Sequence, residues 1–148
     1  MVNHMYAQYD CSIEITNSWL EHNVSRAYYN QSINGMEIHC EIEAENMRGK
    51  SFYVIVFFAY IYDGEYIMLR SRSGNSQFRT RDGSVAVWEK AYAKYDSTYW
   101  EDFVLYIPYY ELAKAISEDS EMVCVIQIQS QSGDTYATSE DMFFDFNF

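Results

Sequence analysis

The stretch "GMEIHCEIEAENMRGK", residues 35–50, decides the fold of this 148-residue chain. It places four glutamates, a histidine and a cysteine close together, which raises the question of a metal or proton-transfer cluster. Every second residue from 38 to 44 is apolar, and the residues between them are polar; the apolar set is Ile38, Cys40, Ile42 and Ala44. Such alternation indicates a β-strand with one dry and one wet side. We therefore predict a strand over residues 36–45 whose glutamates face water.

The segment that follows predicts a second, more deeply buried strand. "SFYVIVFFAYIYDG", residues 51–64, is apolar almost throughout and rich in β-branched and aromatic residues, as expected for a central strand. Asp63-Gly64 and Asp82-Gly83 are hairpin dipeptides, because glycine accepts the positive φ that tight primed turns require. Further strands are expected near residues 11–24, 65–69, 103–107, 122–131 and 142–148.

One helical insertion is expected near residues 109–117. "PYYELAKAI", residues 108–116, has proline at its start and Leu112 and Ile116 four residues apart. Frequent strands linked by hairpin signals predict an all-β fold, an antiparallel two-sheet sandwich of the immunoglobulin or C2-like kind, with seven to nine strands. A closed barrel is the alternative. We treat residues 1–148 as a single β-sandwich domain.

The charge is strongly acidic and unevenly distributed. The formal net charge of −12 argues against binding nucleic acid through its phosphates, which needs clustered cations. Eight of the ten lysines and arginines lie within residues 48–100, so a basic patch on an acidic surface is one expectation; an even mixture after folding is the other. An acidic inhibitor that mimics nucleic acid is a further alternative.

The hydrophobic pattern and the cysteines indicate the cellular compartment and the redox state of the thiols. No apolar run approaches the roughly 20 residues that cross a bilayer, and residues 1–10 carry no signal pattern, so we expect a cytoplasmic protein with no membrane contact. Cys11, Cys40 and Cys124 are odd in number and lie far apart in apolar stretches. We predict three core thiols rather than a disulfide framework.

The sharpest candidate for chemistry is His39 with Glu37 and Glu41. A metal ion could bridge the histidine and one glutamate, but it would need further ligands from a neighbouring strand, and no second histidine lies in a similar strand. The chain has no nucleophile-elbow, phosphate-loop or zinc-protease motif. We expect no catalytic residue, no cofactor and no metal; the alternative is a metal-dependent enzyme, or a calcium- or ligand-binding sandwich, that uses His39 and nearby carboxylates.

Carboxylates elsewhere are expected in loops and turns. Glu101/Asp102 and Glu140/Asp141 form pairs in predicted loops, where charged residues are usually only solvated. Calcium needs six to eight oxygen ligands from a compact set, whereas the turn aspartates are scattered along the chain; they are Asp63, Asp82, Asp96, Asp102 and Asp134.

Two groups are candidates for binding a partner, which we expect to be another protein. The first flanks one predicted loop and consists of Arg70, Arg72, Arg79 and Arg81, whose spacing suits recognition of carboxylates or phosphates. These arginines could instead balance an adjacent glutamate strand and protect a sheet edge. The second group is aromatic and placed on a predicted loop, as in many interface hot spots; it consists of Tyr95, Tyr99 and Trp100. These aromatic residues could equally cap the core.

Four short motifs follow one another along the chain in an order that resembles a known family. "GMEIH" is followed by "MRGK", by "TRDG" and by "DFVLYIPYYEL". This order resembles a small β-sandwich accessory domain of bacterial proteins, described by the patterns GM-x-I-H, M-x-GK, T-x-DG and DF…PY-x-EL. The resemblance implies a sandwich fold, an accessory or binding role and no catalytic residues. It implies structural roles for the motif residues, which are Gly35, Ile38, His39, Gly49, Lys50, Asp82, Gly83, Pro108 and Leu112.

Overall fold

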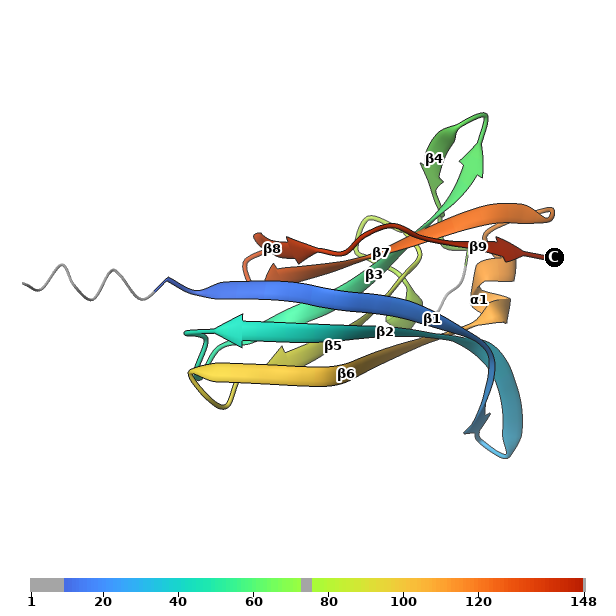
Figure 1. Ribbon diagram of the computed structural model, residues 1–148. Helices are drawn as coiled ribbons and strands as arrows, with labels where there is room; N and C mark the ends of the chain where they lie inside the picture. Colours follow the sequence, from blue (N-terminus) through green and yellow to red (C-terminus); the bar gives the residue numbers. More distant parts are fainter. Residues whose placement is uncertain (1–9, 73–75, 148) are drawn as a thin grey trace, which may run out of the picture.

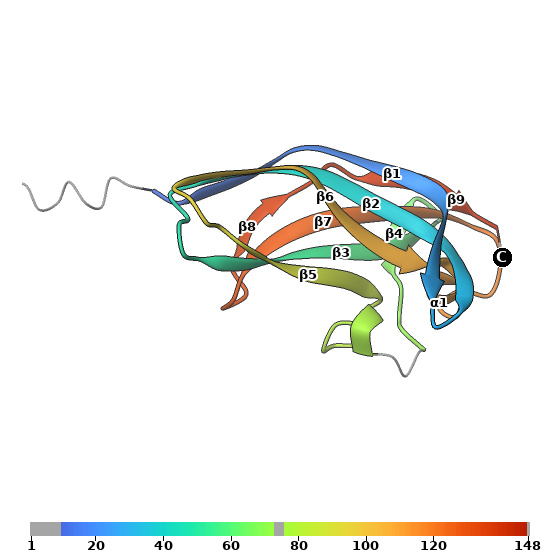
Figure 2. The same cartoon turned by 90° about the horizontal axis from the view of Figure 1, so that it is seen from below.

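The chain forms two antiparallel β-sheets that face each other across one core (Figures 1 and 2). This computed structural model describes residues 10–72 and 76–147. Within those residues there are nine strands, one short α-helix and one 3₁₀ turn, η2 (Ser76–Phe78). Figure 2 separates the layers, with β1, β2 and β6 on one side and β3, β5, β7 and β8 on the other. The predicted all-β sandwich is confirmed, with the strand number at the upper end of the expected range.

The smaller sheet has three strands in the order β1-β2-β6. They are β1 (Ser12–Tyr28), β2 (Gln31–Glu45) and β6 (Ser97–Pro108). The long β1–β2 hairpin curls at its closed end (Figure 1). Its pairing shifts register twice, between Ile15 and Asn17 and between Glu21 and Val24. These β-bulges bend the strand, because two residues of β1 oppose one residue of β2.

The larger sheet has six strands built around the adjacent pair β3 and β7. They are β3 (Ser51–Tyr62), β4 (Glu65–Met68), β5 (Ala86–Tyr92), β7 (Ser120–Ser130), β8 (Thr135–Thr138) and β9 (Met142–Phe146). β5 pairs with the first part of β3 and β4 with its end; β8 and β9 divide β7 in the same way. The central position of β3 explains why its sequence is apolar almost throughout.

The core lies between the sheets and comes mainly from alternate residues of the long strands. On β2 the inward set is the predicted one, and Ile38, Cys40, Ile42 and Ala44 are all fully buried. On β3 the consecutive residues Phe57 and Phe58 point to opposite faces: Phe58 is fully buried, whereas Phe57 is half-buried on the outside. Strand pleating therefore decides which apolar residues enter the core and which stay on a surface.

The predicted turn at Asp63-Gly64 and the helix are present, and the helix is shorter than expected. At Asp82-Gly83 only the glycine has positive φ, 92°, and the flanking residues form isolated bridges instead of a hairpin of two strands. Asp63 and Gly64 both have positive φ, 52° and 79°, as a tight primed hairpin requires. The helix α1 (Tyr109–Ala113) begins after Pro108 and covers five residues rather than nine. No helix within the described residues combines the length and the apolar character that crossing a membrane requires.

The prediction that Tyr99, Trp100, Glu101 and Asp102 lie in loops is wrong. β6 begins at Ser97, so Tyr99, Trp100, Glu101 and Asp102 belong to a strand. "STYWED" hides its strand character because most of its residues are polar. The segment pairs with β2 through a register shift between Cys40 and Ile42, and this shift breaks the simple alternation of the sequence pattern.

Candidate functional site

The outer surface of the three-stranded sheet is dominated by carboxylates, and we call it the acidic face. Glu37, Glu41, Glu43 and Glu45 of β2 alternate with the core residues, as predicted. β1 adds acids at matching positions, because Glu14 lies opposite Glu43 and Glu21 lies opposite Glu37. β6 adds Asp102. Like charges directly opposite each other repel, so this face carries an electrostatic cost.

His39 lies at the centre of the acidic face, but its ring is not in water. The residue is only 4% exposed, although it belongs to the outward set of β2. Trp19 of β1, its cross-strand neighbour, stacks on the imidazole with ring centroids 5.1 Å apart and an interplanar angle of 13°. The expectation that His39 belongs to a solvated face is therefore wrong for the ring, because an aromatic side chain on the next strand covers it.

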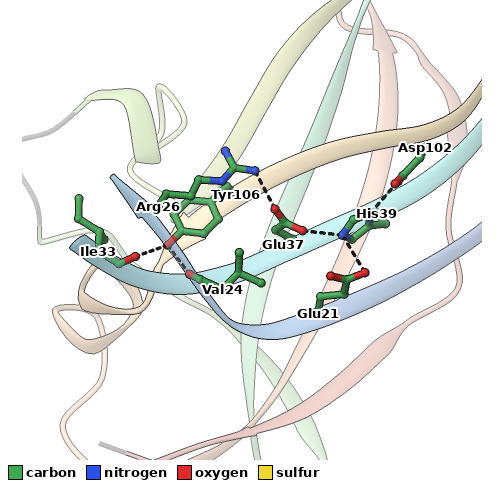
Figure 3. Close-up of polar contacts among 8 residues, drawn as sticks. All are labelled: Glu21, Val24, Arg26, Ile33, Glu37, His39, Asp102 and Tyr106. Carbon is green, nitrogen blue, oxygen red and sulfur yellow. Dashed lines mark hydrogen bonds and ion pairs between the residues drawn. The ribbon is translucent and has the colours of Figure 1, made fainter. Parts of the chain in front are cut away.

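Three carboxylates from three strands surround the His39 ring (Figure 3). Nδ1 lies 2.6 Å from Asp102 Oδ1, while Nε2 lies 2.9 Å from Glu37 Oε1 and 3.6 Å from Glu21 Oε1. We call Glu21, Glu37, His39 and Asp102 the His39 cluster. Sequence reasoning paired His39 with Glu37 and Glu41; the structure adds ligand atoms from β1 and β6 and does not bring Glu41 to the ring.

The polar network continues from Glu37 towards the curled end of the hairpin (Figure 3). Arg26 donates to Glu37 Oε2 at 3.1 Å, and its guanidinium lies 4.3 Å from the centroid of the Tyr106 ring. The Tyr106 hydroxyl lies 2.9 Å from the carbonyl oxygen of Val24 and 3.0 Å from that of Ile33. Burial is the main cause that raises the pKa of Tyr106, so the phenol keeps the proton that it donates.

Gly35 makes room for this network. A Cβ atom at this position would lie 2.4 Å from the Ile107 carbonyl oxygen and 2.6 Å from the Tyr106 hydroxyl. No side chain fits at such distances, so the glycine of the "GMEIH" motif is required by the close approach of β6. A structural role for Gly35 agrees with what the sequence resemblance implies.

The outer surface of the six-stranded sheet has the opposite character. Its centre consists of Tyr53, Ile55 and Phe57 of β3 and Trp88 of β5, and we call these four residues the aromatic face. Trp88 is 45% exposed and lies directly opposite Ile55 in the β3–β5 pairing. Tyr53 and Trp88 meet edge to face, with ring centroids 5.8 Å apart.

The aromatic face forms the floor of a shallow depression. Arg79, Thr80, Arg81 and Asp82 line it on one side, and Gln129 of β7 lines it as well. Arg79 and Arg81 are exposed, and the ion pairs that arginines form within the described residues are those of Arg26 and Arg48. An apolar, aromatic floor with a cationic rim is thus present in the six-stranded sheet.

The four predicted arginines do not form one patch. Arg79 and Arg81 lie beside the aromatic face, whereas Arg72 lines a separate depression near residues 115–121. Arg70 donates to the Asp82 carbonyl oxygen at 2.9 Å and so supports the turn. Arg79 and Arg81 are therefore separated from Arg72, although Arg70 and Arg79 form β-bridges with adjacent residues, Ser84 and Val85 respectively.

The three predicted aromatic residues also separate. Tyr95 is exposed in the turn between β5 and β6. Tyr99 is 50% exposed and lies opposite Glu43 on the acidic face. Trp100 is partly buried and packs edge to face on Phe52 of the core, with centroids 5.5 Å apart. Trp100 is therefore a core residue, and the shared aromatic surface predicted for these residues does not form.

The cysteine prediction is confirmed at two positions of three. Cys40 and Cys124 are buried, one in each sheet, and burial raises the pKa of both thiols to about 12. Cys11 is exposed, and Lys50 Nζ lies 3.1 Å from its sulfur. Cys11 precedes the first residue of β1, so the alternation that buries the later residues does not extend to it.

Comparison with known proteins gives only weak structural likeness. No protein-family model matches the sequence, and no curated protein matches it either. A bacterial adhesin from Mobiluncus mulieris, described as containing intramolecular disulfide, isopeptide and ester bond cross-links, aligns with a TM-score of 0.43 and 8% identity over 93% of this chain. A β-glucosidase from Kluyveromyces marxianus aligns with a TM-score of 0.36 and 12% identity, also over 93%.

The aligned regions are only parts of those proteins. The chain spans 58% of the adhesin and 15% of the β-glucosidase. Neither similarity assigns a residue or an activity to this chain, and the motif order that resembles a bacterial accessory domain has no match among the family models. The site is therefore interpreted from its own geometry.

Proposed function

We propose that this chain is a non-enzymatic protein-binding module whose aromatic face binds an apolar, acid-rimmed surface of a partner protein. The observation that carries the proposal is Trp88, 45% exposed beside three further apolar or aromatic side chains of a sheet surface. Tryptophan, tyrosine and arginine are the residues most enriched among interface hot spots. The aromatic face offers two of them and its rim offers the third.

Charge complementarity indicates the chemistry of the partner. The chain as a whole has a formal charge of −12, and its acidic face repels negatively charged surfaces. Arg79 and Arg81 give the rim of the aromatic face the opposite sign. Guanidinium groups bind carboxylates in a planar, bidentate manner, so a partner with aspartate or glutamate around an apolar centre fits best.

The same features disfavour the acidic nucleic-acid mimic. A mimic needs a continuous negative surface, whereas the centre of the six-stranded sheet's outer surface is apolar and aromatic, with Arg79 and Arg81 beside it. A cytoplasmic location remains a prediction from the sequence. An interaction role remains compatible with the accessory domain that the motif order resembles.

A site-specific crosslinking experiment tests the proposal. A photo-crosslinking amino acid is introduced at position 88 and, as a matched control, at position 99; Tyr99 is equally exposed but lies on the acidic face. In cells that produce the chain naturally, irradiation is expected to yield a discrete crosslinked protein from position 88 and not from position 99.

The captured protein is then purified and its affinity is measured. We expect Trp88→Ala to weaken binding at least tenfold, since truncated hot-spot residues cost more than about 1.4 kcal/mol. Arg79→Glu/Arg81→Glu should weaken binding as well, more at low salt than at high salt, while Tyr99→Ala should leave the affinity unchanged. Crosslinking at position 99 alone, or an affinity indifferent to Trp88→Ala, would overturn the proposal.

A further inference from the structure

The two nitrogens of His39 face carboxylates, and a neutral ring cannot satisfy both. Nδ1 lies 2.6 Å from Asp102 and Nε2 lies 2.9 Å from Glu37. A neutral imidazole carries one N–H, so one of these contacts would set a nitrogen lone pair against a carboxylate lone pair. Because the ring is 4% exposed, water does not separate the groups. A cation, either a second proton or a metal ion, must therefore lie between His39 and one carboxylate.

The position of Asp102 indicates which nitrogen would hold a metal. If Nδ1 donates its N–H to Asp102, the closer carboxylate, the Nε2 lone pair points towards Glu37 and Glu21. A carboxylate on the far nitrogen is the usual partner of a metal-binding histidine, because it fixes the tautomer and raises the basicity of the ligand. Trp19 holds the ring in the same orientation by stacking.

The spacing of the donor atoms fits a small tetrahedral ion. Glu21, Glu37 and His39 each offer one ligand atom, and these atoms lie within 4.8 Å of one another. Ligands bound at about 2.0–2.2 Å in a tetrahedron lie roughly 3.3–3.6 Å apart. The distance from Nε2 to Glu21 Oε1, 3.6 Å, lies in this range, and the distance from Nε2 to Glu37 Oε1, 2.9 Å, would lengthen by about 0.4 Å when an ion binds.

Charge also favours a divalent cation over a proton. With a protonated ring, the three carboxylates of the cluster face two positive groups, the imidazolium and Arg26. With a neutral ring, a divalent ion and Arg26 together balance the three negative charges. Arg26 binds Glu37 Oε2 and leaves Oε1 for the ion. The Glu21 side chain is 54% exposed, so an ion and a water ligand can reach the cluster from solvent.

We propose that Glu21, Glu37 and His39 bind a divalent transition-metal ion of the zinc class, with Asp102 as the positioning residue. A nitrogen ligand argues against calcium and magnesium, which prefer all-oxygen sites. Sequence reasoning expected no metal because no second histidine lies nearby; β1 supplies a glutamate instead. The ion would join β1 to β2 directly before the bulge that follows Glu21, independently of the aromatic face.

Titration of the untagged, chelator-stripped protein with Zn²⁺ tests the proposal. We expect binding of one ion per chain by calorimetry and, at a free concentration 100-fold above the dissociation constant, a melting temperature higher by about 5 °C or more. Co²⁺ is expected to give the intense visible absorption of a tetrahedral site. Glu21→Gln, an exposed substitution that should preserve the fold, is expected to weaken Zn²⁺ binding at least tenfold.

Glu43→Gln is the matched control, because it removes the same charge from an exposed position of the same face. It should leave the affinity for Zn²⁺ unchanged. An equal loss of Zn²⁺ affinity in both variants would show that the ion is held by diffuse electrostatic attraction and would overturn the proposal. No saturable binding, together with two N–H signals from the His39 ring in NMR spectra of the stripped and Zn²⁺-treated protein, would show that a proton holds the cluster and would also overturn it.

Discussion

The outer face of the three-stranded sheet carries carboxylates, whereas the outer face of the six-stranded sheet carries aromatic and aliphatic side chains. Both are built by the same alternation of strand residues, with Glu37 and His39 outward on β2 and Tyr53 and Ile55 outward on β3. On the acidic face, unfavourable charges gather around a buried imidazole. On the aromatic face, apolar surface remains partly exposed.

This difference teaches that the two faces contribute to different free energies. The His39 cluster contains contacts that exist only when the sandwich is folded, so changes there should alter the free energy of unfolding. The aromatic face lacks such a buried network, so changes there should mainly alter binding to a partner. Five measurements can test this contrast.

The largest effect is expected from adjacent residues that belong to different surfaces of β3. Phe58 is fully buried between the sheets, so Phe58→Ala should lower the free energy of unfolding by about 3–5 kcal/mol. Phe57 lies on the aromatic face, and Phe57→Ala should cost about 1 kcal/mol. Urea denaturation of both variants measures the difference. Equal costs would mean that the aromatic face is covered and structurally equivalent to the core.

A smaller effect is expected from the centre of each face. His39→Ala removes the partner of Glu37 and Asp102 and the stacking on Trp19, and should cost about 1–3 kcal/mol in chelator-treated protein. Trp88→Ala loses one edge-to-face contact with Tyr53 and should cost about 0.5–1.5 kcal/mol. Thermal or urea unfolding gives both values. A larger cost for Trp88 than for His39 would reverse the assignment of the two faces.

A modest stabilisation is expected when a repulsive pair on the acidic face is reversed. Glu14 lies opposite Glu43, so Glu14→Lys replaces a like-charge pair with an opposite-charge pair and should add about 0.2–1 kcal/mol. Ser25→Lys introduces a lysine opposite neutral Asn34 and serves as the control. Added sodium chloride should reduce the stability gained by Glu14→Lys, because it screens both the repulsion that the substitution removes and the attraction that it introduces. A destabilised Glu14→Lys protein would show that Glu14 has a favourable partner.

The smallest difference is expected between the reactivities of Cys40 and Cys124, which lie on the inner sides of the two sheets. Burial raises the pKa of Cys40 and of Cys124 from 9.0 to about 12, so neither forms appreciable thiolate at pH 8 in the folded protein. A thiol reagent should therefore modify Cys11 rapidly and the other two slowly and similarly, as mass spectrometry can show. Fast modification of one buried thiol would mean that its sheet opens locally.

The same pKa shifts set the sign of a pH effect on stability. The unfolded chain loses its thiol protons near pH 9, before the folded protein does, so both cysteines favour the folded state fully below that pH. This contribution is lost as the pH rises from about 9 towards 12. Alanine at both positions should remove this part of the alkaline destabilisation, which urea titrations at pH 8 and pH 10 can compare.

Much of the fold could be predicted because the decisive signals are local. The alternation from 37 to 45 specifies β2, the apolar run from 51 specifies a central strand, and Asp63-Gly64 specifies a turn. These patterns act within a few residues, where strand geometry and backbone conformation alone decide. The sandwich class follows from their number and spacing.

The sites were less predictable because they depend on register between distant strands. Asp102 is 63 residues from His39 and reaches it because β6 pairs with β2 through a shift that its polar sequence does not announce. Glu21 and Trp19 reach the same ring through pairing between two bulges. The local sequence "SWLEH", residues 18–22, lies within the strand predicted near residues 11–24, but it does not specify the neighbouring strand.

The interrupted pairing of β1 also bears on how molecules of this chain behave toward one another. β1 is an outer strand of its sheet, and a regular edge of 17 residues would be an open template for intermolecular pairing and fibril growth. The shifts after Ile15 and Glu21 divide that edge into shorter runs, and Glu14 and Glu21 add charge along it. A second chain that paired with this edge would lose register within a few residues. The irregularity that shapes the hairpin should thus also protect concentrated solutions of the protein from polymerisation.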